Sequence, residues 1–134
     1  MSTEHNIDLD SAFMQLGNIV KKNDETVAES YYAAAEHAKN FVFKMYHAEE
    51  GFFYTGTMND GISINNTIYP LDANTWAIQS FYNEPGFDAE KVMLYIENNF
   101  RDPASGFYKF SDKTPTGYWT EGSYQKIVSD HVLG

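Results

Sequence analysis

Residues 69–76 read Tyr69-Pro70-Leu71-Asp72-Ala73-Asn74-Thr75-Trp76, and a similar stretch recurs as Tyr118-Trp119-Thr120-Glu121-Gly122-Ser123-Tyr124-Gln125. A Gly-aromatic segment precedes each stretch, and the two glycines, Gly51 and Gly106, lie 55 residues apart. The acids of the two stretches lie 49 residues apart, so the second loop is the shorter one. A fainter third copy, Ile7-Asp8-Leu9-Asp10, stands near the start of the chain. The features recur in one order, which indicates an internal repeat.

Apolar residues at helical spacing predict five helices, over about residues 9–22, 25–47, 72–83, 88–100 and 121–132. Asp24 and Asp88 stand where N-caps are expected. Between the second and third helices, Phe52-Phe53-Tyr54 and Ile62-Ser63-Ile64 flank Asp60-Gly61, which predicts a small β-hairpin. No linker or low-complexity segment interrupts the chain, so residues 1–134 are expected to form a single domain.

Each repeated unit would consist of a helix, a Gly-aromatic loop and a second helix that an acid opens. A hairpin of this kind cannot bury its own apolar face and must stack on its neighbours. The sequence therefore predicts an all-α fold, a helical-hairpin repeat with short β-hairpin-like loops between the helices.

The two stretches that contain Asp72 and Glu121 resemble repeats of the α/α-toroid enzymes, particularly the six-hairpin glycosidase-like superfamily, and the resemblance covers about residues 8–134. In that superfamily six hairpins close a ring, and the active site lies in its mouth. The resemblance implies a partial (α/α) toroid, because five helices make about two and a half hairpins. The chain would then be a fragment, a reduced open array, or a subunit that is completed by association.

The candidate catalytic residues are Asp72 and Glu121. A glycoside hydrolase needs two carboxyl groups on either side of one glycosidic bond, about 5–5.5 Å apart in retaining enzymes and about 6.5–9.5 Å apart in inverting ones. Acids at matching first-turn positions of neighbouring helices can reach this range. The structural alternative is that each acid, like Asp10, only caps the start of a helix. In the second stretch Thr120 offers another cap, which would leave the Glu121 carboxylate available.

The candidate substrate-binding residues are aromatic side chains beside the two acids and one amide, namely Tyr69, Trp76, Tyr118, Trp119 and Gln125. Aromatic rings would stack on sugar faces, and an amide would bond a sugar hydroxyl. The alternatives are that the aromatic rings belong to the core and that Gln125 bonds a loop carbonyl.

Composition excludes several classes of function. The chain has no cysteine, so disulfides and thiolate sites are excluded. A net charge of −10 without a basic cluster argues against nucleic-acid binding. No apolar window is long enough for a membrane span, and no signal peptide is visible, so a cytoplasmic location away from membranes is expected. The four histidines show no paired metal-ligand spacing, and we expect neither a metal nor a cofactor.

These observations predict a carbohydrate-active domain that binds or hydrolyses glycans, with an oligosaccharide as its partner. The alternative is a non-catalytic helical-repeat module for protein interaction or self-association. In that case the partner would be a second copy in a homo-oligomer, or the missing hairpins of a longer chain. The direction in which the aromatic side chains point distinguishes the two interpretations, and catalysis itself stays open.

Overall fold

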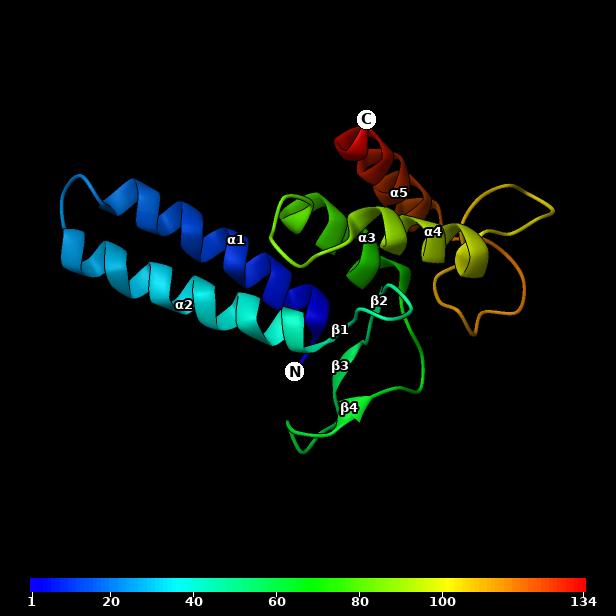
Figure 1. Ribbon diagram of the computed structural model, residues 1–134, viewed down its shortest axis with the longest axis horizontal. Helices are drawn as coiled ribbons and strands as arrows, with labels where there is room; N and C mark the ends of the chain where they lie inside the picture. Colours follow the sequence, from blue (N-terminus) through cyan, green and yellow to red (C-terminus); the bar gives the residue numbers. More distant parts are fainter.

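Five helices and four short strands form the protein, and the computed structural model describes residues 1–134 (Figure 1). The helices are α1 (Thr3–Val20), α2 (Glu25–Lys44), α3 (Leu71–Phe81), α4 (Ala89–Phe100) and α5 (Thr120–Leu133). The strands are β1 (Tyr46–His47), β2 (Phe52–Phe53), β3 (Gly56–Thr57) and β4 (Ile64–Asn65). All five helices overlap the ranges predicted from the sequence.

The prediction of an all-α helical-hairpin repeat forming a partial toroid is wrong. Helices account for 56% of the chain, and the remainder includes two separate antiparallel two-stranded sheets, β1–β2 and β3–β4. The protein is therefore a small mixed α/β domain. The segment between α2 and α3 folds back on itself as strands, and it does not simply connect one helical hairpin to the next.

The pairing of the strands also differs from the predicted hairpin. Phe52–Phe53 does not pair across the Asp60-Gly61 turn, because it pairs with Tyr46–His47 instead. The turn connects β3 to β4, and the Asp60 carboxylate accepts hydrogen bonds there from the backbone N–H groups of Ile62 and Ser63. The Asp-Gly signal located the turn, and the flanking apolar runs suggested the wrong partner for β2.

Helices α1 and α2 run side by side as a long hairpin that extends away from the rest of the molecule (Figure 1). Asp24 caps α2 as predicted, accepting from the Val27 N–H at 3.0 Å. Helix α1 begins at Thr3 with Ser2 as its cap, so the predicted start at residue 9 is too late. Asp10 lies inside α1, and neither it nor the stretch 7–10 opens a helix.

Helix α3 lies at the centre of the molecule and packs against α1, α4 and α5. Its apolar residues form much of the core together with residues from α1, α2, β2 and α4, for example Leu71, Ile78, Val42, Phe53 and Ile96. Its polar residues Asn74 and Thr75 are also buried, and both have hydrogen-bond partners. The scarcity of charges in this segment predicted burial nearly all round, and the structure confirms it.

Helix α5 is turned opposite to the usual amphipathic arrangement. Its apolar face carries Tyr124, Ile127 and Val128, which are 65%, 56% and 48% exposed. The buried residues of α5 are Gly122, Ser123, Lys126 and Ser129. A helix normally buries its apolar stripe, so an outward apolar face is typical of a surface that binds a ligand or another protein.

The two matched stretches of sequence make matching hydrogen bonds at their loops. The Phe53 N–H donates to Asn74 Oδ1 at 2.9 Å, and the Tyr108 N–H donates to Ser123 Oγ at 3.0 Å. Each loop also has a corresponding backbone bond of 2.8 Å. The Gly51 N–H donates to the His47 carbonyl, and the Gly106 N–H donates to the Asp102 carbonyl. Each Gly-aromatic loop is therefore fastened to the first turn of the helix that follows it, although the overall fold is not a repeat array.

Gly122 is required where α5 meets the core. A Cβ added there would lie 2.3 Å from the Trp119 ring and 2.8 Å from a methyl carbon of Leu71. We expect Gly122→Ala to destabilise the protein by about 1–3 kcal/mol, as overpacking commonly does. Urea unfolding checks this, with Ser80→Ala at an exposed α3 position as the control. Equal stability of Gly122→Ala and the control would show that the Trp119 ring can move aside.

Candidate functional site

A groove of about 630 Å³ lies between α3 and α5. Its apolar part consists of Trp76, Tyr124 and Val128, and its polar part consists of Gln79, Thr120, Glu121 and Gln125. This volume is within the range of small-molecule sites, and such sites combine aromatic walls with a few polar groups. Three of the predicted site residues, Trp76, Glu121 and Gln125, meet in this groove.

A seam of hydrogen bonds fixes the floor of the groove. Thr75 Oγ1 donates to Gln125 Oε1 at 3.0 Å, and Gln79 Nε2 donates to the Gln125 carbonyl at 3.0 Å. Ser129 Oγ donates to the Thr75 carbonyl at 3.1 Å, and Gln79 Nε2 also lies 3.2 Å from Ser129 Oγ. Residues four apart on a helix share one face, so each helix presents two side chains to the other. The groove is therefore held open by two helices that are fixed to each other.

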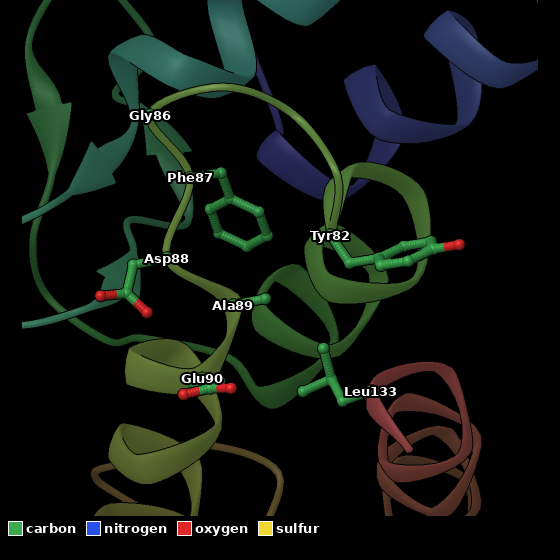
Figure 2. Close-up of a pocket in the computed structure, with 7 residues that line it drawn as sticks. All are labelled: Tyr82, Gly86, Phe87, Asp88, Ala89, Glu90 and Leu133. Carbon is green, nitrogen blue, oxygen red and sulfur yellow. The ribbon is translucent and has the colours of Figure 1, made fainter.

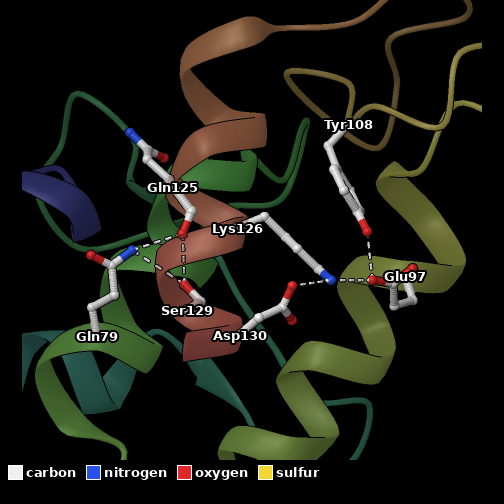
Figure 3. A network of polar contacts seen from close by, with 7 residues as sticks. All are labelled: Gln79, Glu97, Tyr108, Gln125, Lys126, Ser129 and Asp130. Carbon is white, nitrogen blue, oxygen red and sulfur yellow. Dashed lines mark hydrogen bonds and ion pairs between the residues drawn. The ribbon is translucent and has the colours of Figure 1, made fainter. Parts of the chain in front are cut away.

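Two amide atoms in the groove have no partner in the protein. Gln125 Nε2 donates no hydrogen bond, and Gln79 Oε1 accepts none, whereas the other end of each amide belongs to the seam. Figure 3 shows these two atoms projecting to the same side of α5. One is a donor and the other an acceptor, and both are held in place by the bonds at their opposite ends.

The opposite side of α5 is tied to α4 through Lys126 (Figure 3). Its ammonium group lies 2.5 Å from a Glu97 oxygen and 2.8 Å from an Asp130 oxygen, and Tyr108 donates to Glu97 at 2.5 Å. Burial acts against the charge, yet the hydrogen bonds to Asp130, Glu97 and Tyr108 raise the pKa of Lys126. Burial likewise disfavours the Glu97 carboxylate, but the bonds from Lys126 and Tyr108 outweigh it and lower the pKa of Glu97. The network thus holds α5 by charged groups in their ionised forms.

Asp72 and Glu121 line different hollows. Glu121 is exposed in the groove and forms no hydrogen bond or ion pair. Asp72 is half-buried beside a smaller hollow of about 150 Å³, where its Oδ1 accepts from the Ala73 N–H at 2.7 Å. Asp72 therefore accepts one backbone N–H at the start of its helix, as the capping alternative expects. Glu121 accepts none.

The charges of the two acids nevertheless interact. Burial raises the pKa of Asp72; the Ala73 N–H opposes this effect, and the Glu121 carboxylate adds to it. Burial also raises the pKa of Glu4, with Asp72 and Glu121 contributing in the same direction. These three acids stand in the first turns of α1, α3 and α5, and because their charges interact, the starts of these helices lie near one another. Sequence reasoning missed Glu4, because it placed the start of the first helix too late.

The other predicted binding residues lie outside the groove. Tyr69 stacks on Phe52 at 4.4 Å between ring centroids. Tyr118 is 58% exposed and stacks on Phe107 at 5.0 Å. Trp119 packs edge-on against Phe110 and closes over Gly122. Tyr69 and Trp119 also pack against the core, which is the alternative that the sequence left open for the aromatic residues.

A second hollow, of about 530 Å³, lies where the loop between α3 and α4 faces the end of α5 (Figure 2). Tyr82, Phe87, Glu90 and Leu133 are among its lining residues. Asp88 also lines it, but this side chain caps α4 by accepting from the Lys91 N–H at 2.9 Å. The Pro85-Gly86 break in the sequence marked this loop, although nothing in it suggested a binding site.

The chain matches no family model, no curated protein and no solved structure. None of its helices combines the length and the apolar character that crossing a membrane requires. No group of three or more His, Asp or Glu side chains is arranged to hold a metal ion.

The Lys126 network yields a prediction about stability. Lys126→Met leaves Glu97 without its cation, and we expect the free energy of unfolding to fall by about 1.5–3 kcal/mol at pH 7, as for other hydrogen bonds to charged groups. Lys113→Met is the control, because that lysine is exposed beside Asp112 and solvent screens the pair, so its loss should change stability much less. Urea unfolding at several pH values provides the measurement.

The pH dependence of this effect has a definite sign. Folding lowers the pKa of Glu97, so its stabilising contribution is present above the ordinary value of 4.5 and is lost as the pH falls through the lower folded value. The difference between the wild type and Lys126→Met should therefore shrink in acid. A difference that is constant down to low pH would contradict the role of the Glu97 charge.

The contribution of Asp72 to stability depends on pH in the opposite direction. Its folded pKa is raised, so the protonated form favours the folded state, and that advantage is lost as the pH rises through the folded value. Asp72→Asn keeps the acceptor for the Ala73 N–H and removes the charge. We expect its Tm at pH 7 to rise by a few degrees, equivalent to about 1 kcal/mol or less, and the gain to vanish below pH 3.8. Calorimetry tests this, and a lower Tm at pH 7 would show that the charge stabilises the start of α3.

Proposed function

We propose that the protein binds carbohydrate in the groove between α3 and α5. The observation that carries the proposal is the meeting of two aromatic side chains, Trp76 and Tyr124, with unpaired amide groups in one hollow. A sugar ring has apolar C–H faces and a rim of hydroxyl groups, so it needs a flat apolar surface and nearby hydrogen-bonding groups. The groove offers both.

The aromatic wall contributes most of the contact. Tyr124 is 65% exposed, which leaves its ring available to a ligand, and Trp76 is only partly buried against the core. Val128 extends the apolar wall one turn further along α5. Stacking a sugar here covers apolar surface that α5 otherwise presents to water.

The amides supply orientation. A sugar hydroxyl both donates and accepts, so it can accept from Gln125 Nε2 while a neighbouring hydroxyl donates to Gln79 Oε1. Because the other ends of both amides are engaged in the seam, little side-chain entropy is lost on binding. Preorganised groups of this kind favour a specific ligand orientation.

The geometry favours binding over hydrolysis. Hydrolysis needs two carboxyl groups on one glycosidic bond. Only Glu121 lines the groove, and Asp72 lines the neighbouring small hollow, where a backbone N–H occupies one of its oxygens. We therefore assign Glu121 to ligand contact and assign no catalytic pair.

A second candidate function is protein association through the same face. The observation that favours it is the outward apolar stripe of Tyr124, Ile127 and Val128. Ile127 is exposed outside the groove lining, so an association surface would extend beyond the sugar site. A second copy of this chain, or another protein, would cover the whole stripe.

Calorimetric titration with neutral oligosaccharides, after a glycan-array screen, tests the proposal. We expect Tyr124→Ala to weaken binding at least about tenfold, which corresponds to one lost aromatic contact. Tyr118→Ala is the matched control, because Tyr118 is similarly exposed but lies outside the groove, and it should leave affinity unchanged.

Two outcomes decide against carbohydrate binding. The first is that no glycan binds at millimolar concentration, and the second is that Tyr118→Ala and Tyr124→Ala weaken binding equally. Light scattering separates the second candidate, because a dimer that Ile127→Asp dissociates identifies the stripe as an interface between copies.

A further inference from the structure

The groove contains a carboxylate but no cation. Glu121 is exposed within it, and neither a Lys nor an Arg lines the hollow. Glu121 forms no ion pair, whereas several other acids of the chain, for example Glu36, Glu97 and Asp130, are paired with lysines. An unpaired carboxylate beside two aromatic rings is suited to a ligand that carries a positive charge.

The charges around Glu121 also favour a positively charged ligand. Asp72 and Glu4 are near enough to Glu121 for their charges to interact, and His5 is the one basic side chain that acts on both of them. His5 Nε2 lies 3.3 Å from a carboxylate oxygen of Glu4, so this side chain is already paired. The whole chain has a net charge of −10, so the long-range field also attracts cations and repels anions.

From this geometry we infer that the groove selects amino sugars, whose protonated amine pairs with Glu121 while the ring stacks on Tyr124 and Trp76. This inference rests on the proposed carbohydrate binding and names the chemical class of the glycan. An acidic glycan, such as a uronic-acid oligomer, would place its carboxylates against Glu121 with no cation to receive them. A neutral glycan would retain the stacking and the amide contacts and would lack the ion pair.

Three tetrasaccharides of equal length distinguish these classes: a glucosamine oligomer, its fully N-acetylated counterpart and a galacturonate oligomer. Calorimetric titration at about pH 5.5 keeps most of the primary amines protonated. In low salt we expect the amine form to bind at least about tenfold more tightly than the acetylated form, and the acidic form to bind most weakly. About 0.5 M salt should reduce the preference, because the ion pair is solvent-exposed.

Two variants attribute the preference to one residue. Glu121→Gln should remove most of the difference in affinity between the amine and acetylated forms, and the remaining difference reflects the other acids of the chain. Glu29→Gln, at an exposed position on α2, removes the same charge from the protein elsewhere and should preserve the difference. This control separates a specific ion pair from general attraction to an acidic protein.

The outcomes are distinct. Equal binding of the amine and acetylated forms, or a preference that Glu121→Gln leaves undiminished, overturns the inference and leaves the carbohydrate site in place. Absence of binding by all three oligomers, and by the glycans of the array, overturns the proposed function itself.

Discussion

The hydrogen-bonded seam between α3 and α5 fixes how the two helices of the groove are packed together. Thr75 and Ser129 are completely buried where the two helices meet, and each bonds to a group of the opposite helix. Unpaired polar groups at this depth would be costly, so the two helices have one favourable register. That register brings Trp76 and Tyr124 together at the edge of the seam and leaves one end of two amides unpaired.

The seam also explains why α5 exposes its apolar face. Small and polar residues face inward, since Ser123 and Ser129 bond the neighbouring loop and α3, and Gly122 admits the Trp119 ring. Lys126 then turns toward α4, where Glu97 receives its charge. With these positions occupied, Tyr124, Ile127 and Val128 can only face outward. The apolar surface of the groove is therefore a consequence of how α5 is fastened.

The sequence predicted the local features better than their assembly. The helices and the Asp24 and Asp88 caps follow from short-range rules, and the structure shows both caps. The pairing of Phe52–Phe53 with Tyr46–His47 depends on tertiary packing, which the Asp-Gly turn signal does not report. The prediction of a repeat fold is wrong for the same reason. The two Gly-aromatic loops share hydrogen bonds with the following helix, and shared local contacts do not dictate how helices stack.

The candidate site was predictable in part. Glu121, Gln125 and Trp76 were identified from their positions in the matched stretches, and they do meet. Gln79 and Tyr124 could not be assigned in advance, because periodicity places Tyr124 on an apolar stripe that ordinarily faces the core. Its exposure is visible only once Ser123, Lys126 and Ser129 are seen to bond to other segments of the fold.

The acids at the helix starts show where shared sequence position and shared function separate. Glu4, Asp72 and Glu121 all occupy the first turns of helices, where the helix dipoles favour negative charge. Their environments differ, because Asp72 is half-buried and bonded to the Ala73 N–H, whereas Glu121 projects unpaired into the groove. Equivalent positions thus give one acid a structural contact and the other a ligand-facing charge. The aromatic walls around Glu121, and not its place in the repeat, make it the residue through which the groove can recognise a charged group.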